Sequence, residues 1–117
     1  MAPDLGVLAS EDFCYLTTVG RVTGRPHEIE IWFSIDDTTL YMLSGSHRSD
    51  WVKNLRKTPE VTVRIANRTF EGHARVVGAR REDELARRLL VEKYEKTPGS
   101  LASWRRSALP VAVALVA

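Results

Sequence analysis

The sequence has only one cysteine, Cys14, and therefore cannot form an internal disulfide. Paired-cysteine zinc motifs are missing, and the three histidines stand far apart without a cysteine or carboxylate at ligand spacing. Cys14 lies in an apolar stretch, where a small buried thiol is the usual role. We therefore expect no bound metal, a structural Cys14, and a reducing, cytoplasmic setting.

Long apolar runs and a strong charge imbalance are also missing. No segment approaches the roughly 20 apolar residues that span a bilayer, and we expect neither a leader nor stable membrane insertion. The 17 basic residues exceed the 15 acidic ones by two, an excess too small to predict nucleic-acid binding. Walker loops, dinucleotide-binding glycine motifs and nucleophile elbows are absent, which disfavours those enzyme classes.

Six segments rich in β-branched and aromatic residues dominate the chain. In one of them Ile29, Ile31 and Phe33 alternate with polar residues, which is typical of a half-buried strand. The length of 117 residues fits a single domain, residues 1–117. The expected strands are Phe13–Val19, Glu28–Ile35, Thr39–Leu43, Val61–Ile65, Thr69–Val77 and Val111–Val116.

Two segments have helical character, Ser49–Lys57 and Arg81–Lys96. Ser49 is a suitable N-cap for the first, and Thr58-Pro59 ends it. The second is expected to bury Leu85, Leu89 and Tyr94. Many short strands with few helices predict a mainly β (α+β) fold, a six-stranded closed or partly closed barrel with two or three covering helices.

The segment 20–27 connects two expected strands and is rich in glycine and arginine. Gly20 and Gly24 allow close approach of the backbone, and Arg21 and Arg25 supply permanently charged donors that suit phosphate or carboxylate. An anion-binding loop is one interpretation. A solvated hairpin turn is the other, since the same residue types are common in loops.

The segment 44–55 joins a strand end to a helix start. Its backbone N–H groups can face an anionic or carbonyl-bearing ligand, with Trp51 and Asn54 beside it. The alternative is structural, with Trp51 as a core anchor and Asn54 as a packing residue. The residues alone leave both interpretations open.

Taken in order, these segments resemble the deazaflavin-dependent nitroreductase family within the split β-barrel superfamily that includes pyridoxamine phosphate oxidases. The resemblance covers most of the chain and lies in residues 16–26, 43–45 and 51–63, including the run Trp51-Val52-Lys53-Asn54-Leu55. It implies a split β-barrel, FMN-binding-like, and an oxidoreductase that uses reduced coenzyme F-420 to pass a hydride to a quinone, nitroaromatic or enone. It also implies that the protein forms a homodimer and that it acts on a small-molecule electron acceptor.

The resemblance further assigns roles to particular residues. Ser44 is a candidate proton donor, and Tyr94 at the end of the second helix is another. Val22 and His27 stand where relatives often carry basic residues, so this phosphate pocket has less charge than many. The cofactor-binding residues implied by the family are Arg21, Thr23, Gly24, Arg25, His27, Ser44, Gly45, Ser46, Trp51 and Asn54.

Two other functions remain open from the sequence. One is an oxidoreductase of the same fold that uses FMN. The other is a carrier that binds a flavin, haem or another anionic small molecule without turnover, with His47 as a possible haem ligand.

Overall fold

The computed structural model describes residues 5–116 of the chain. Within them, seven strands form one antiparallel sheet, accompanied by a short 3-10 helix (Gly6–Leu8) and three α-helices. The strands are β1 (Cys14–Val19), β2 (Pro26–Ile31), β3 (Ser34–Asp36), β4 (Thr39–Ser44), β5 (Glu60–Ile65), β6 (Arg68–Val76) and β7 (Leu109–Val116). The helices are α1 (Asp50–Lys57), α2 (Arg80–Tyr94) and α3 (Ala102–Ser107).

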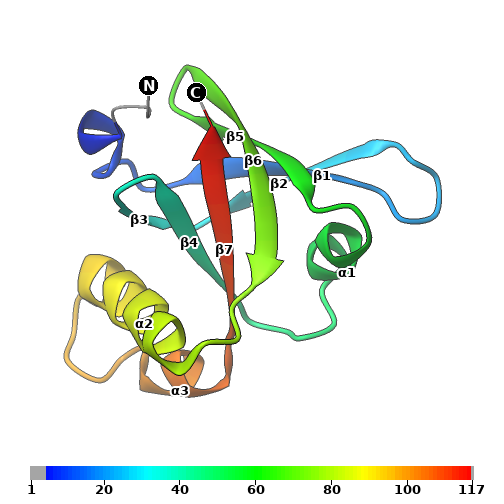
Figure 1. Ribbon diagram of the computed structural model, residues 1–117. Coiled ribbons are helices and arrows are strands. Elements are labelled where there is room, and N and C mark those ends of the chain that lie inside the picture. The colour runs from blue at the N-terminus through cyan, green and yellow to red at the C-terminus, as the bar shows by residue number, and fades with distance from the viewer. Residues whose placement is uncertain (1–4, 117) are drawn as a thin grey trace.

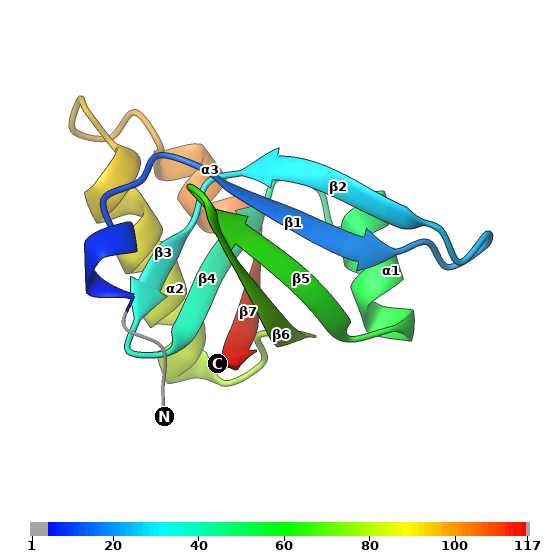
Figure 2. The same cartoon turned by 90° about the horizontal axis from the view of Figure 1, so that it is seen from above.

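The sheet order is β2-β1-β5-β6-β7-β4-β3, so β2 and β3 are the two edges although they follow one another in the chain. The sheet curls strongly between these edges (Figures 1 and 2), as expected of a split barrel. The hairpin β5–β6 has a two-residue turn in which Ala66 takes a φ of 56°. Positive φ is what a tight hairpin turn requires. The predicted mainly β barrel is confirmed.

Two apolar clusters lie on the two faces of the curled sheet. The larger fills the inside of the curl and includes Leu16, Phe33 and Val63, each fully buried. The smaller lies between the sheet and α2 and includes Leu90 and Tyr41. Cys14 belongs to the inner cluster, where burial raises the pKa of its thiol to about 12, so its predicted structural role is confirmed.

The expected strand Glu28–Ile35 is two strands, and this raises the count from six to seven. The chain leaves the sheet at Trp32 and Phe33. There the Tyr94 hydroxyl accepts a hydrogen bond from the N–H of Phe33 at 3.0 Å, and the Lys93 ammonium donates to its carbonyl at 2.9 Å. Side chains of α2 therefore satisfy backbone groups that a continuous strand would pair with a neighbour.

Both predicted helices form, with differences in detail. Ser49 occupies the N-cap position of α1, but its hydroxyl donates to the Ser46 carbonyl at 3.1 Å and does not cap the helix. In α2 the buried positions are Ala86, Leu90 and Val91, while the predicted Leu85, Leu89 and Tyr94 are only partly buried. The buried stripe is rotated because α2 packs on β3, β4 and β7 together.

The position of α1 matters most for the site. This helix packs on β1 and β6, beneath the base of the β1–β2 hairpin, which projects beyond the rest of the molecule (Figure 2). Within the described residues, no helix combines the length and apolar character that membrane crossing requires.

Candidate functional site

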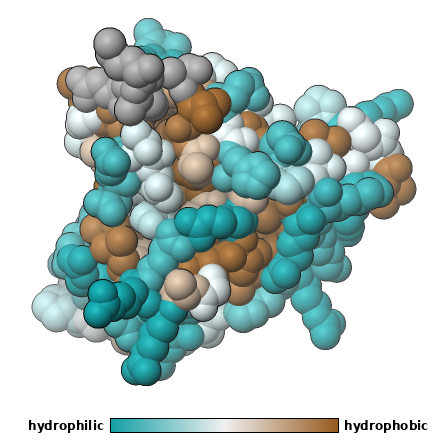
Figure 3. Space-filling model, in the orientation of Figure 1, coloured by the Kyte–Doolittle hydropathy of each residue, from teal (hydrophilic) through white to brown (hydrophobic). Residues whose placement is uncertain are grey.

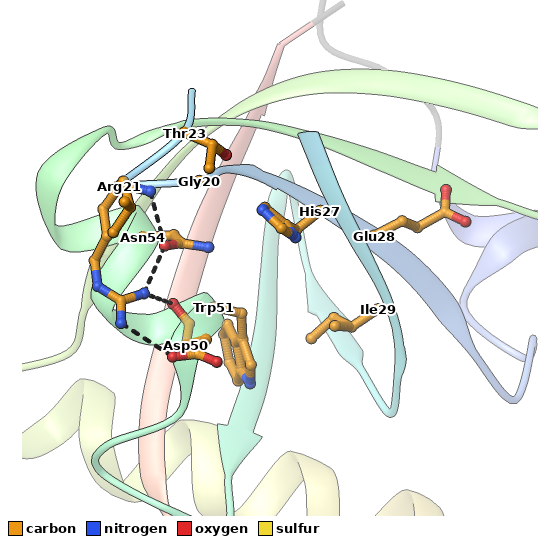
Figure 4. A pocket seen from close by; sticks show the side chains of 10 residues that line it. Gly20, Arg21, Thr23, His27, Glu28, Ile29, Asp50, Trp51 and Asn54 are labelled. Carbon is orange, nitrogen blue, oxygen red and sulfur yellow. Dashed lines mark hydrogen bonds and ion pairs between the residues drawn. The ribbon is translucent and has the colours of Figure 1, made fainter. Parts of the chain in front are cut away.

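A cavity of about 450 Å³ lies between the β1–β2 hairpin and the start of α1. Figure 4 shows His27 and Ile29 reaching from β2 toward α1, while the Glu28 side chain points away. The carboxylate of Glu28 instead pairs with Arg64 at 3.7 Å. The residues lining the cavity are Gly20, Arg21, Val22, Thr23, His27, Glu28, Ile29, Asp50, Trp51 and Asn54.

Arg21 is fixed at the wall of this cavity by α1. The Asn54 side-chain oxygen accepts hydrogen bonds from the Arg21 backbone N–H at 3.1 Å and from its Nη1 at 2.9 Å. The Arg21 Nη2 pairs with Asp50 Oδ1 at 3.0 Å, and Nη1 also donates to the Asp50 carbonyl at 3.5 Å. These contacts select one orientation of a long side chain that is otherwise costly to order.

The pairing of Arg21 leaves part of its hydrogen-bonding capacity unused. A guanidinium carries five N–H groups. The side chain makes three hydrogen bonds within residues 5–116, so two donors remain for a ligand. Nearby, Lys57 donates to the Arg21 carbonyl at 2.8 Å, and hydrophilic side chains cover the region of α1 (Figure 3).

Gly20 is needed where the hairpin leaves β1. A Cβ at this position would lie 2.7 Å from Nε2 of His27 and 3.0 Å from the Arg25 carbonyl. The absence of a side chain therefore lets the imidazole lie against the backbone and form one wall of the cavity. Gly24 closes the turn with a φ of 74°, which glycine adopts without strain.

The hairpin tip carries the remaining predicted residues of this loop. The Thr23 hydroxyl accepts a hydrogen bond from the Arg25 N–H at 3.2 Å and keeps its own proton to donate. Arg25 and Val22 are exposed, Val22 by 88%. The tip thus presents its cation to solvent, at the edge of the cavity.

The loop 44–49 is held by its own serines. The Ser44 hydroxyl is buried and donates to the Ser46 carbonyl at 2.6 Å, and the Ser46 hydroxyl accepts from the Arg48 N–H at 3.1 Å. Neither serine nor Gly45 lines the cavity. These groups shape the approach to α1, and the Ser44 proton is engaged within the loop.

Tyr94 lies on α2, away from this cavity. Its hydroxyl lies 2.8 Å from the Asp12 carbonyl and 2.9 Å from that of Phe33, and its ring stacks on Trp32. Burial raises the pKa of the Tyr94 hydroxyl to about 12. Lys93 beside it has its pKa lowered by burial to about 8. Both groups hold the β2–β3 corner together.

The structure thus brings together half of the predicted cofactor-binding residues: Arg21, Thr23, His27, Trp51 and Asn54. The other five lining residues were not among those predicted to bind the cofactor: Gly20, Val22, Glu28, Ile29 and Asp50. Ile29 follows from the two-residue period, since it shares a strand face with His27. Asp50 has no such signal, because its place depends on how the hairpin folds over α1. No cluster of three or more potential metal-ligating side chains occurs in residues 5–116.

The donor set fits coenzyme F-420, a ring system with an anionic phosphate-bearing tail. The unused Arg21 donors, the Thr23 hydroxyl and the His27 imidazole suit phosphate oxygens. Ile29 and the indole of Trp51 offer apolar surface for a flat ring. Asp50, whose side chain is 83% exposed, directs Arg21 and adds one negative charge at the rim.

Solved structures resemble this fold along nearly the whole chain. One is a candidate 5-nitroimidazole antibiotic resistance protein from Bacteroides thetaiotaomicron, with a TM-score of 0.78, 15% identity, and coverage of 96% of this chain and 77% of that one. A candidate pyridoxamine 5'-phosphate oxidase from Listeria innocua has a TM-score of 0.73 and 20% identity, with 97% and 90% covered. An F-420H2-dependent reductase has a TM-score of 0.71 and 20% identity, with 90% and 94% covered.

At these identities the structures establish the fold, and the sequence comparison establishes the family. No curated protein matches the chain significantly. The model of the F-420H2-dependent quinone reductase family matches residues 5–115, almost all of the sequence. This match confirms the predicted deazaflavin-dependent family and its cofactor, coenzyme F-420. The chain therefore belongs to the F-420H2-dependent quinone reductase family.

Proposed function

We propose that this protein is a reductase that transfers a hydride from reduced F-420 to a quinone, nitroaromatic or enone acceptor. The observation that carries the proposal is the orientation of Arg21 by Asn54 and Asp50 at the wall of the hairpin cavity. A preoriented guanidinium with unused donors binds an anionic group at lower entropic cost than a free one.

The chain's contribution is binding and orientation. Among the residues that line the cavity, Arg21, Thr23 and His27 would hold the phosphate side of F-420, and Ile29 and Trp51 would border its ring. When bound, reduced F-420 supplies the hydride. The protein has to keep the ring face open to the acceptor while the hairpin retains the tail.

The proton that accompanies the hydride needs a source. A quinone becomes a hydroquinone by gaining one hydride and one proton, and an enone becomes a saturated ketone in the same way. Ser44 donates its proton to the Ser46 carbonyl, and the Tyr94 hydroxyl has its pKa raised by burial. We therefore place the proton source in solvent at the open cavity.

The proposal is tested by titrating the purified protein with F-420 and, separately, with FMN, while binding is measured by fluorescence. Arg21→Ala is expected to weaken F-420 binding by about 1.5–3 kcal/mol, roughly 10- to 150-fold, since a charge-assisted hydrogen bond is lost. Arg80→Ala is the matched control, because the Arg80 side chain is 93% exposed on α2 and, within residues 5–116, its ion pair is with Glu84. Its affinity should equal that of the unmodified protein.

Each outcome has a definite meaning. Saturable F-420 binding with acceptor-dependent oxidation of the reduced cofactor supports the proposal. Tighter binding of FMN than of F-420 would mean that the protein uses FMN as its cofactor on the same fold. Binding without acceptor reduction would support a carrier, and equal affinity of Arg21→Ala and Arg80→Ala would remove the site assignment.

A further inference from the structure

A second cavity, of about 520 Å³, lies between the end of β2, the end of β4 and α3. It contains none of the residues that line the first. Its lining is apolar or aromatic with one exception, the carboxylate of Glu30. The lining residues are Phe13, Glu30, Ile31, Trp32, Leu43, Leu101 and Trp104.

The second cavity lies on the other face of β2 from the first. Successive side chains of a strand point to opposite faces, so Glu30 shares the face of Glu28, whose side chain points away from the first cavity (Figure 4). Trp32 and Trp104 pack on the cluster between the sheet and α2, whereas Ile29 and Trp51 pack on the inner cluster. A molecule in the second cavity therefore does not overlap one held between the hairpin and α1.

The aromatic wall of the second cavity is fixed in place. The Trp32 ring stacks on Tyr94, with centroids 4.3 Å apart and planes 2° apart, and meets the Trp104 ring edge-on at 5.7 Å. Tyr94 is itself tied to the backbone of Phe33 and Asp12. Such a rigid wall suits a flat, apolar molecule, because little side-chain freedom is lost on binding.

Glu30 gives this apolar cavity a negative charge. Its carboxylate accepts a hydrogen bond from the Tyr15 hydroxyl at 2.8 Å, which holds it in one direction. The nearest cation recorded in this region, Arg64, lies over the Tyr15 ring and pairs with Glu28 at 3.7 Å. Glu30 thus has no ion-pair partner among residues 5–116, and an anion beside it is repelled.

We propose that the second cavity is a separate binding site for a flat, uncharged aromatic molecule and that Glu30 makes it select against anionic ones. This inference goes beyond the proposed reductase function. The aromatic wall provides the affinity, and the carboxylate provides the charge discrimination.

The test compares two ligands of similar shape and different charge, anthraquinone-2-sulfonamide, which is neutral, and anthraquinone-2-sulfonate, which is an anion. Binding is measured without cofactor, by tryptophan quenching in a Trp51→Phe background. Only Trp32 and Trp104, both at the second cavity, then emit. The neutral ligand should bind more tightly. Glu30→Gln should reduce the ratio of the two affinities by about threefold to tenfold, as expected for a screened charge at a surface.

Two further variants serve as comparisons. Glu28→Gln removes the same charge two residues along β2, where the carboxylate pairs with Arg64, and should change the ratio much less. Trp104→Leu should weaken both ligands alike, with thermal unfolding measured to show that the protein remains folded. Equal binding of the two ligands, an unchanged ratio in Glu30→Gln, or unchanged affinity in a folded Trp104→Leu protein would overturn the inference.

The cofactor titration separates this inference from the proposed function. If F-420 binds and the anthraquinone pair is not distinguished, only the second-cavity assignment fails. If the pair is distinguished and F-420 does not bind, the cavity and its charge selection stand, while the reductase proposal fails.

Discussion

The side-chain oxygen of Asn54 accepts hydrogen bonds from both the backbone N–H and the guanidinium of Arg21, at 3.1 and 2.9 Å. Asn54 is 3% exposed, and its amide nitrogen donates to the buried Thr18 hydroxyl at 3.2 Å. One amide thereby joins α1, β1 and the second residue of the hairpin loop, Arg21. The geometry of the cavity depends on this joint.

Asn54→Ala should therefore affect both stability and ligand binding. It leaves the Arg21 N–H and the Thr18 hydroxyl without their partner in a buried place, at a cost of about 2–3 kcal/mol in the free energy of unfolding. F-420 affinity should fall as well, because Arg21 loses its orientation. Urea denaturation gives the first quantity and fluorescence titration the second.

Asn54→Asp tests whether the hydrogen-bond acceptor at residue 54 causes these losses. The carboxylate still accepts from Arg21, so the hairpin should stay in place and most of the stability should return. Lys53→Ala, at an exposed position of the same helix, is the control for helix propensity. If Asn54→Ala unfolds at the same urea concentration as Lys53→Ala, the joint does not hold the hairpin.

Gly20→Ala tests the close contact between the hairpin and His27. The added Cβ would lie 2.7 Å from the imidazole, so the ring must move out of the cavity wall. We expect F-420 affinity to fall by about 1–2 kcal/mol, roughly a fivefold to thirtyfold change. Gly78→Ala is the control, because its Cβ would meet no atom within 4 Å.

The double variant Gly20→Ala/His27→Ala shows whether the contact is the cause. Removing the imidazole removes the clash, so the two substitutions should be strongly non-additive. Simple addition of their effects on affinity and on unfolding would place the cost of Gly20→Ala elsewhere, at the Arg25 carbonyl.

The fold was largely predictable because local patterns dominate it. The alternation Ile29, Ile31, Phe33 placed a face on the core, and Phe33 is fully buried. The break after Ile31 was not predictable, since it depends on Tyr94 and Lys93, more than 60 residues away in sequence, satisfying the backbone of Phe33. The rotated face of α2 has a similar origin in tertiary packing.

The site was predictable where the sequence carries a motif with a physical reason. Arg21, Thr23 and His27 surround the turn glycines, and Trp51 and Asn54 begin a helix. The mutual placement of Arg21 and Asp50 was not, because it requires the hairpin to fold onto α1. The second cavity has no local motif at all, since its walls come from four separate segments of the chain.

Glu82 predicts acid sensitivity of the packing of α2. Two hydrogen bonds from Arg75, and a third from Tyr41, lower the pKa of this carboxyl from 4.5 to about 2. A pKa lowered by folding stabilises the protein above pH 4.5, and this stability is lost as the pH falls toward 2. We expect a loss of about 1–2 kcal/mol, since Arg75 is half exposed and screened. Urea unfolding at pH 6 and pH 3 measures it, and in Glu82→Gln this part of the pH dependence should disappear.

The lowered pKa of Lys93 predicts that its contribution to stability increases in alkali. Burial lowers the pKa of its ammonium from 10.5 to about 8, so between these values the folded protein holds fewer protons than the unfolded chain. Its burial therefore costs stability below pH 8, and this cost is relieved as the pH rises toward 10.5. Cys14 acts in the other direction above pH 9, because the pKa of its thiol is raised to about 12.

The contribution of Lys93 is isolated by comparison with Lys93→Met, whose side chain is also unbranched, one atom shorter and uncharged. The unfolding free energy of the unmodified protein minus that of Lys93→Met should rise by about 1–2 kcal/mol between pH 7 and pH 10. A constant difference over this range would mean that the ammonium is as well hydrated in the folded protein as in the unfolded chain.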